Sequence, residues 1–188
     1  MQVTGPERTC FELIRRGPLE EAVVAVDAML RAKSVTMDGM AGYIAGKTGW
    51  NGVPLAREAL RLADPRAASC PESRLRVCWV TEAGLPRPDV NVPVHSSDGW
   101  FLGVPDLPDP ATGLVGEYDG AHHRRLKQHS DDNVREERME ASGLTVVRAT
   151  AIDLRSRWRE LRDRLRQGRG NARWRTPVIR RWTTRPPY

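Results

Sequence analysis

The stretch VPDLPDPATGLVGEYDGAHHR, residues 104–124, decides how the second half of this chain is expected to fold. Within it, Leu114 to Asp119 has the length and composition of a short β-strand that a glycine ends. Side chains two residues apart on a strand point to the same face, about 7 Å apart, so Glu117 and Asp119 share a face. Asp106 ends the preceding predicted strand and can lie beside them. Three carboxylates are therefore predicted to converge at strand ends.

Carboxylates held this close repel one another unless a proton or a cation lies between them. Hard oxygen ligands of this kind suit Mg²⁺ or Mn²⁺, and such a site can polarise a phosphodiester and lower the pKa of an attacking water. The alternative is a set of exposed acids at turns, because Asp106 and Asp109 lie among prolines and Asp119-Gly120 is a common turn dipeptide.

Glu72, on an earlier predicted helix, is the candidate for a further acid. Its spacing also fits two structural roles. Ser69-x-x-Glu72 has the spacing of a capping box, and Glu72 with Arg76 has that of an i,i+4 ion pair.

His122 and His123 follow the predicted strand directly. A histidine beside a metal-bound phosphate can act as a general acid, and the alternative is that both are solvated loop residues. A zinc site that includes His129 fits no common ligand spacing and has no nearby cysteine. A ββα-metal nuclease, with His123 and Asn133 as candidate site residues, is a further alternative. Such a nuclease places its site residues on a hairpin and a following helix, whereas these histidines follow a strand.

Apolar periodicity and capping signals predict the remaining elements. Helices are expected from a capping box at Thr9-x-x-Glu12 and over 19–30, 36–44, 53–63, 69–83, 130–142 and 151–167; strands are expected over 90–94, 100–106, 114–119 and 144–149, with a hairpin turn at 96–99. The order after residue 69 is α-β-β-β-α-β-α, which predicts an α+β (mixed α/β) fold. The predicted domains are a helical N-terminal subdomain (1–66), a second domain (67–167) and a basic, flexible tail (168–188).

The formal net charge is +6, and residues 168–188 carry six arginines and no acid, so they account for all of it. The sequence therefore places the surface for nucleic acid in this tail, at Arg169, Arg173, Arg175, Arg180 and Arg181. Arg148, at the end of the last predicted strand, either reaches a phosphate or exits to solvent. Arg135 has the spacing of an ion-pair partner for Asp131 or Asp132.

No run of about 18 apolar residues and no signal-peptide core is visible, and the three cysteines form no C-x-x-C pair. These features predict a soluble, cytoplasmic protein without a membrane partner, a disulfide scaffold or a cysteine zinc site. The helical first third carries no catalytic pattern and is expected to be a packing or docking unit.

Several segments together resemble the endonuclease-like domains related to the very-short-patch-repair (Vsr) mismatch endonuclease, of the PD-(D/E)xK or restriction-endonuclease-like superfamily. They are PESRLR (71–76), AGLPRPDVNVPV (83–94), VPDL (104–107), GEYDGAHHR (116–124), DDNVREERMEASGLTVVRAT (131–150) and Asp153-Leu154. The resemblance covers about residues 69–166. Such domains often form the C-terminal part of proteins resembling AbiEi-type abortive-infection antitoxins. Residues 9–65 resemble the helical segment that lies upstream in the same proteins.

The resemblance implies an α-β-β-β-α-β core, with Asp106 and Glu117 as Mg²⁺ ligands and Glu72 as the helix glutamate that completes many such sites. The lysine position of the motif falls on Asp119, so activation of the water would come from the metal or from His122 or His123. The winged-helix domain of longer relatives has no counterpart in this chain.

Two functions are therefore expected. The first is a metal-dependent endonuclease that hydrolyses DNA phosphodiester bonds in a repair or phage-defence setting. The second is a nonenzymatic, antitoxin-like or regulatory module that keeps the nuclease fold to bind DNA or a protein such as a partner toxin.

Overall fold

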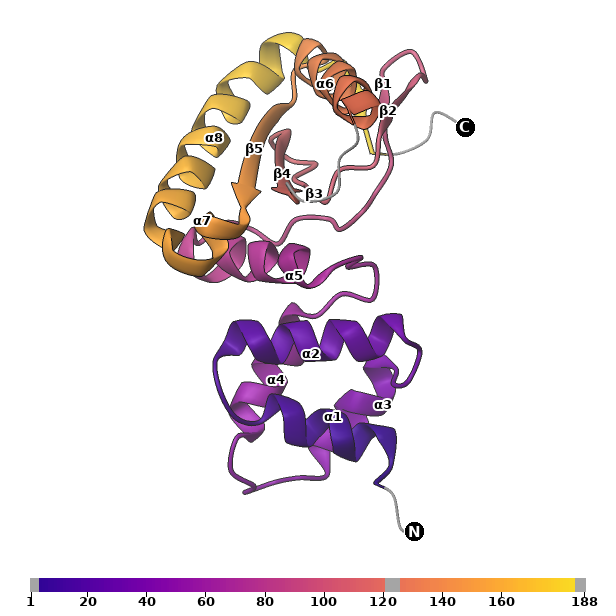
Figure 1. The fold of residues 1–188 in the computed structure, drawn as a ribbon, viewed down its shortest axis with the longest axis vertical. Helices are drawn as coiled ribbons and strands as arrows, with labels where there is room; N and C mark the ends of the chain where they lie inside the picture. Colours follow the sequence, from indigo (N-terminus) through magenta and orange to yellow (C-terminus); the bar gives the residue numbers. More distant parts are fainter. Residues whose placement is uncertain (1–3, 121–125, 185–188) are drawn as a thin grey trace. The chain divides into compact units, whose positions relative to one another are not determined.

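The computed structural model describes the backbone of residues 4–120 and 126–184, with the side chains of all these residues except 126–133 and 173–179. The described residues form eight α-helices, a π-helical turn and two small three-stranded sheets (Figure 1), so the predicted mixed α+β class is confirmed. The chain divides into two compact units, Met1–Val77 and Cys78–Tyr188. The division falls inside the helical stretch predicted over 69–83.

The first unit is helical. Its helices are α1 (Pro6–Ile14), α2 (Leu19–Arg31), α3 (Met37–Ala45), α4 (Val53–Leu62) and α5 (Cys70–Val77). The apolar stripe predicted for α2 is buried at Val23, Val26 and Leu30. At the start of α3, the Thr36 hydroxyl accepts a hydrogen bond from the Gly39 N–H at 3.0 Å, which confirms the predicted cap.

The first helix begins earlier than predicted. It starts at Pro6, because proline suits the first helical position, and Thr9 therefore lies inside the helix. The Thr9 hydroxyl donates to the Gly5 carbonyl at 3.2 Å, and Glu12 pairs with Arg15 at 2.6 Å. The capping box predicted at Thr9-x-x-Glu12 is wrong.

A buried polar network holds this helical unit together. The Asp27 carboxylate accepts hydrogen bonds from the Asp64 N–H at 2.8 Å, from the Ser73 hydroxyl at 2.5 Å and from the Arg76 guanidinium. Arg76, for which the sequence suggested Glu72 as a partner, is fully buried against Asp27 and also donates to the Leu62 carbonyl at 2.9 Å. Burial of this pair is tolerated because nearly every charged atom has a partner.

The second unit contains the strands. Its elements are η1 (Cys78–Glu82), β1 (Val94–Ser96), β2 (Phe101–Gly103), β3 (Leu107–Pro108), β4 (Leu114–Asp119), α6 (Leu126–Ala141), β5 (Thr145–Thr150), α7 (Ala151–Ser156), α8 (Trp158–Ile179) and β6 (Trp182–Thr183). One sheet has the order β2-β1-β6 and the other has the order β3-β4-β5. β1 and β2 pair antiparallel, which confirms the predicted hairpin, but the strand predicted over 90–94 is shifted to Val94–Ser96, and the one predicted over 100–106 is confined to Phe101–Gly103.

The second sheet sets the register of the predicted acids. β4 has the predicted bounds and pairs antiparallel with β3, with Leu107 opposite Gly116. It pairs parallel with β5, which α6 connects to it, and here Glu117 lies opposite Arg148. The second unit thus presents two consecutive strands, a helix and a parallel return strand, as the sequence predicts.

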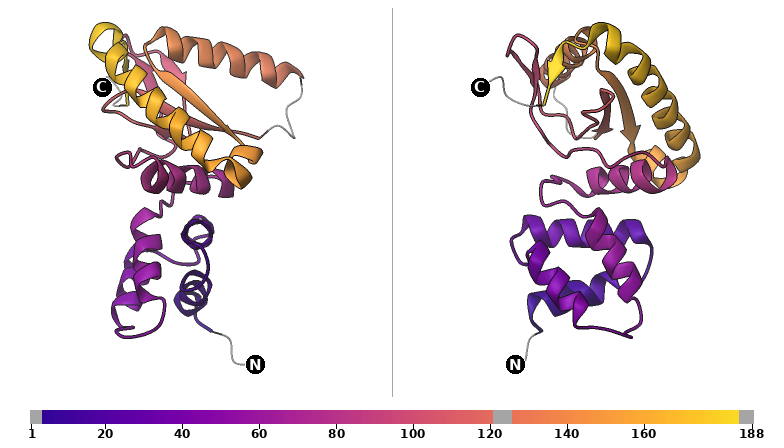
Figure 2. Two further views of the ribbon diagram at one scale, coloured as in Figure 1. Left: turned by 90° about the vertical axis from the view of Figure 1, so that its left-hand side faces the viewer. Right: turned by 180° about the vertical axis from the view of Figure 1, so that it is seen from behind.

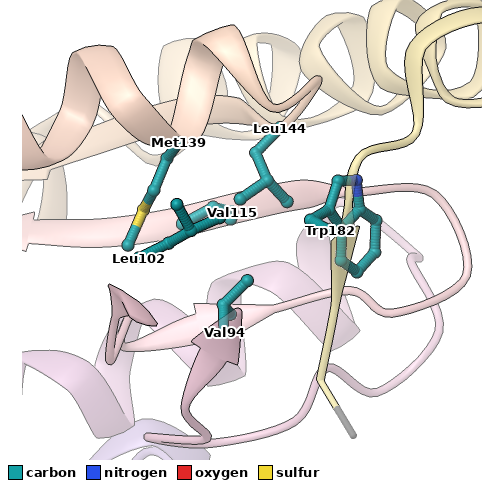
Figure 3. Packing of buried hydrophobic residues seen from close by; sticks show 6 residues of the cluster. All are labelled: Val94, Leu102, Val115, Met139, Leu144 and Trp182. Atoms are coloured by element: carbon teal, nitrogen blue, oxygen red, sulfur yellow. The ribbon is translucent and has the colours of Figure 1, made fainter. Parts of the chain in front are cut away.

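Two helices cover the two faces of this sheet. Val115 faces α6 and belongs to a buried cluster drawn in Figure 3, whose members are Val94, Leu102, Val115, Met139, Leu144 and Trp182. On the opposite face, α8 runs along β5 (Figure 2) and Gly168 packs against Leu114 and Val147. The α6 face therefore carries the odd-numbered residues of β4, Glu117 included.

The segment 168–188 differs from the flexible tail predicted for it. α8 passes Gln167 and continues to Ile179, and β6 then pairs with β1. Gly168 does not end the helix. A glycine stands there because helix and sheet approach so closely that a Cβ would lie 2.7 Å from Val147 Cγ2. Its role is that of a contact glycine, which a single sequence does not distinguish from a helix-ending one.

Candidate functional site

The predicted acid Asp106 lies at the bend directly before β3 rather than at the end of a strand, and Glu117 lies on the neighbouring strand β4. Leu107 pairs with Gly116, so the antiparallel register places Asp106 beside Glu117. The Asp106 Oδ2 atom accepts a hydrogen bond from the Tyr118 N–H at 2.8 Å, which fixes this carboxylate against β4. The structure thus brings two of the predicted acids together at the edge of one sheet.

Two arginines and a second glutamate surround Glu117. Arg135 of α6 donates to both Glu117 carboxylate oxygens, at 3.1 and 3.3 Å, and Arg148 of β5 pairs with Glu136 of α6. These side chains line an open hollow of about 200 Å³, its mouth included. The lining residues are Glu117, Arg135, Glu136, Met139, Val146 and Arg148.

Burial first, and then the negative charge of Asp106, raise the pKa of Glu117, which lies at about 7 with all neighbouring charges included. Arg135 and Arg148 act in the opposite direction without restoring the ordinary value. Only 14% of the Glu117 side chain is exposed. Near neutral pH this carboxyl group therefore gains or loses a proton readily, and a nearby cation would favour its charged form.

Asp119 and Glu72 have different settings. Asp119 ends β4 opposite Thr150, on the same face as Glu117 and partly exposed. Glu72 belongs to the first unit, where its carboxylate accepts hydrogen bonds from the Ala68 N–H at 2.9 Å and the Ser69 hydroxyl at 2.7 Å. The Glu72 N–H also donates to the Ser69 hydroxyl at 3.4 Å, which is the cap expected from the Ser69 spacing, and the ligand role of Glu72 stays a prediction.

The histidines of the predicted site, His122 and His123, lie outside the described residues. Among the side chains that are described, no group of three or more His, Cys, Asp or Glu residues is placed to hold a metal ion. The donor set that the structure does bring together is the carboxylate pair of Asp106 and Glu117.

The arginines predicted to bind nucleic acid are only partly available. Arg169 lies 3.5 Å from the Asp109 carboxylate, and Arg180 lies over the Trp182 ring, 4.4 Å from its centroid. Arg181 is exposed, while the side chains of Arg173 and Arg175 are outside the described set. Arg148 neither exits freely to solvent nor stands alone, because it pairs with Glu136.

Arg135 is the site residue whose role the sequence missed. The sequence suggested Asp131 or Asp132 as its partner, whose side chains lie outside the described set, and the structure pairs Arg135 with Glu117. The available signal was helical spacing: Arg135 is four residues before Met139, which is buried, so both lie on the inward stripe of α6. Both also pack against Gly103, where a Cβ would come within 2.9 Å of Arg135 Cδ and 2.7 Å of Met139 Cε.

Comparison with known proteins gives two similar sequences from Mycobacterium tuberculosis, "Uncharacterized protein MT2308" (strain CDC 1551 / Oshkosh) and "Uncharacterized protein Rv2248" (strain ATCC 25618 / H37Rv). Each is 30% identical over 153 residues, which is 81% of this chain and 56% of the relative. The chain thus spans a little over half the length of these relatives. No family model matches the sequence, and no solved structure matches it significantly.

No helix in the described part of the chain is long and apolar enough to cross a membrane.

Proposed function

We propose that the second unit is a metal-dependent DNA endonuclease domain with a restriction-endonuclease-like core. The order of its elements supports the fold: a helical segment, a β-hairpin, β3 paired antiparallel with β4, then α6 and the parallel strand β5. The resemblance to Vsr-like domains implies the order α-β-β-β-α-β, with which this order agrees except that four short strands, β1 to β4, precede α6.

The observation that carries the proposal is the juxtaposition of Asp106 and Glu117. Asp106 directly precedes β3 and Glu117 lies on the adjacent strand β4, where it is largely buried with its pKa raised to about 7, first by burial and then by Asp106. Their repulsion is only partly relieved by the arginines around them. A divalent cation bound between the two carboxylates would relieve this repulsion.

The residues fit Mg²⁺ or Mn²⁺ in the usual way for these ions. Mg²⁺ is commonly held by one or two carboxylates, with waters and substrate phosphate oxygens completing its shell. Asp106 and Glu117 supply two hard oxygen donors, and a phosphate would supply others. When bound, the ion would polarise the phosphodiester and lower the pKa of the attacking water.

The protein side chains have separate tasks in this proposal. Tyr118 holds Asp106 in place through its backbone N–H, and Arg135 and Arg148 place positive charge beside Glu117, where a phosphate would approach. The metal, or His122 or His123, would activate the attacking water, as the resemblance implies, since Asp119 stands at the lysine position.

A cleavage assay tests this function. Supercoiled plasmid incubated with the full chain should be nicked or cut in Mg²⁺ or Mn²⁺ and not in EDTA. Asp106→Asn and Glu117→Gln should each lower the rate by about 100-fold or more, as expected when a group acting on the transition state is removed. Asp98→Asn, an exposed acid in the β1–β2 turn, serves as the control and should cleave normally. Metal-dependent cleavage that survives both site variants would refute the assignment.

A nonenzymatic role is the second candidate, and two observations favour it. Arg135 already occupies both oxygens of Glu117, and a lysine is missing at the position of Asp119. In that case the fold would serve as a scaffold that binds DNA or a partner protein. The scaffold would bind DNA equally well in EDTA and in Mg²⁺ and would cleave in neither.

A further inference from the structure

We infer that the turn between α7 and α8 is a binding surface for the phosphate backbone of duplex DNA, with Arg155, Arg157 and Arg159 as its contacts. The choice of DNA as partner rests on the proposed nuclease function. The surface itself is identified from side-chain exposure and pairing.

These three arginines differ from their neighbours in having no counter-ion among the residues that the structure describes. All three are exposed, and none makes a side-chain hydrogen bond or ion pair to another residue within the described ranges. Nearby arginines of the same unit are engaged by carboxylates or carbonyl groups. Those engaged residues are Arg135, Arg148, Arg162, Arg164, Arg166 and Arg169.

The turn that carries the arginines is firmly held. Thr150 and Asp153 form a capping box at the start of α7. Arg164 of α8 then binds the Asp153 carboxylate at 2.8 Å and the Arg148 carbonyl at 2.9 Å, which ties α8 to the end of β5. The arginine side chains therefore project from an ordered backbone, so little backbone entropy is lost on binding.

The surface begins where the acid-bearing strand ends. β4 and β5 are parallel, Asp119 lies opposite Thr150, and α7 starts at the next residue, as Figure 1 shows for β5 and α7. Paired strands are about 4.8 Å apart, and the 6 residues of α7 extend about 9 Å. A DNA strand held at these arginines can thus pass the carboxyl end of β4, close to Glu117.

The chemistry of the patch favours phosphate. A guanidinium presents a planar fork that matches two phosphate oxygens, and the exposed charged residues between 151 and 160 are the three arginines and Glu160. The sequence had placed the electrostatic contacts after residue 168, where Arg169 proves to be paired. Three exposed arginines without a side-chain partner in the described part of the chain lie at the turn before α8.

A binding assay tests the inference. Fluorescence anisotropy measures the binding of the full chain to a fluorescein-labelled DNA duplex of about 20 base pairs, in EDTA and at about 50 to 200 mM salt. The triple variant R155Q/R157Q/R159Q is compared with R16Q/K33Q/R57Q. That control removes the same charge from exposed residues of the first unit. Circular dichroism melting checks that both variants fold, and R155K/R157K/R159K tests rescue by charge.

The patch variant should bind at least about tenfold more weakly than the control, and the slope of log affinity against log salt should become shallower by about 3. The lysine variant should recover most of the slope. Equal affinity for the patch variant and the control, or no duplex binding by the wild type at low salt, would overturn the inference. Because the assay contains no metal, its result is independent of cleavage. If the patch variant loses DNA binding but the wild type shows no metal-dependent cleavage, the inferred surface stands and the proposed nuclease function is refuted.

Discussion

At the scale of single residues, Glu117 is the group on which the account depends. It combines three properties that sequence alone predicts only in part: it lies beside Asp106, it is largely buried, and it is paired with Arg135. The first followed from strand spacing, because residue alternation is a local rule. The other two depend on how α6 packs, which is a long-range contact that no local pattern encodes.

The raised pKa of Glu117 predicts a pH-dependent stability. Its native pKa of about 7 lies above the ordinary value of 4.5, so between these values the folded protein retains a proton that the unfolded chain releases. The stabilisation is complete below pH 4.5 and is lost as the pH rises through 7. The loss from pH 5 to 8 should amount to about 1–3 kcal/mol.

Urea unfolding at a series of pH values measures this effect. Glu117→Gln should remove that part of the pH dependence, because an amide does not titrate in this range. Asp98→Asn, at an exposed turn, should leave it unchanged. A Glu117→Gln profile parallel to that of the wild type from pH 5 to 8 would contradict the assigned environment.

At the scale of elements, the strands and helices with strong periodicity were predictable, and most of their ends were not. β4 has its predicted bounds, since its apolar residues, acids and terminal glycine all indicate a strand. α8 was predicted to stop at Gln167 because glycine is a common helix terminator, yet Gly168 serves close packing against β5. The distinction depends on a residue of another element, Val147, and so is invisible locally.

Gly168→Ala should therefore destabilise the second unit by about 1–3 kcal/mol through overpacking against Leu114 and Val147. Gly170→Ala is the matched control, because a Cβ there meets nothing within 4 Å. The control should be neutral or stabilising by up to about 1 kcal/mol, since alanine has the higher helix propensity. Chemical unfolding of the two variants provides the comparison, and equal stabilities would show that the helix does not approach the sheet this closely.

At the scale of the whole molecule, the charge distribution is not what composition suggested. The formal charge of +6 equals the charge of the six arginines after residue 167, but within the described ranges much of that segment is helix or strand. The C-terminal segment returns to β1 and contributes Trp182 to the core cluster. Residues that looked like an appendage are part of the folded unit.

Trp182→Ala should destabilise the second unit by about 3–5 kcal/mol, because the ring is 3% exposed and fills the cluster between α6 and the sheets. Trp100→Ala, at a site 76% exposed, should change the free energy of unfolding by no more than about 0.5 kcal/mol. Thermal and urea unfolding distinguish the two. A neutral Trp182→Ala would mean that the C-terminal segment does not close the core.

The central claim is that Asp106 and Glu117 together hold a divalent cation, and calorimetric titration of the full chain with Mn²⁺ tests it most directly. The account predicts saturable binding that Asp106→Asn and Glu117→Gln each weaken by about tenfold or more, while Asp98→Asn leaves it unchanged. The absence of Mn²⁺ binding by the wild type, or the same affinity in both site variants, would contradict it.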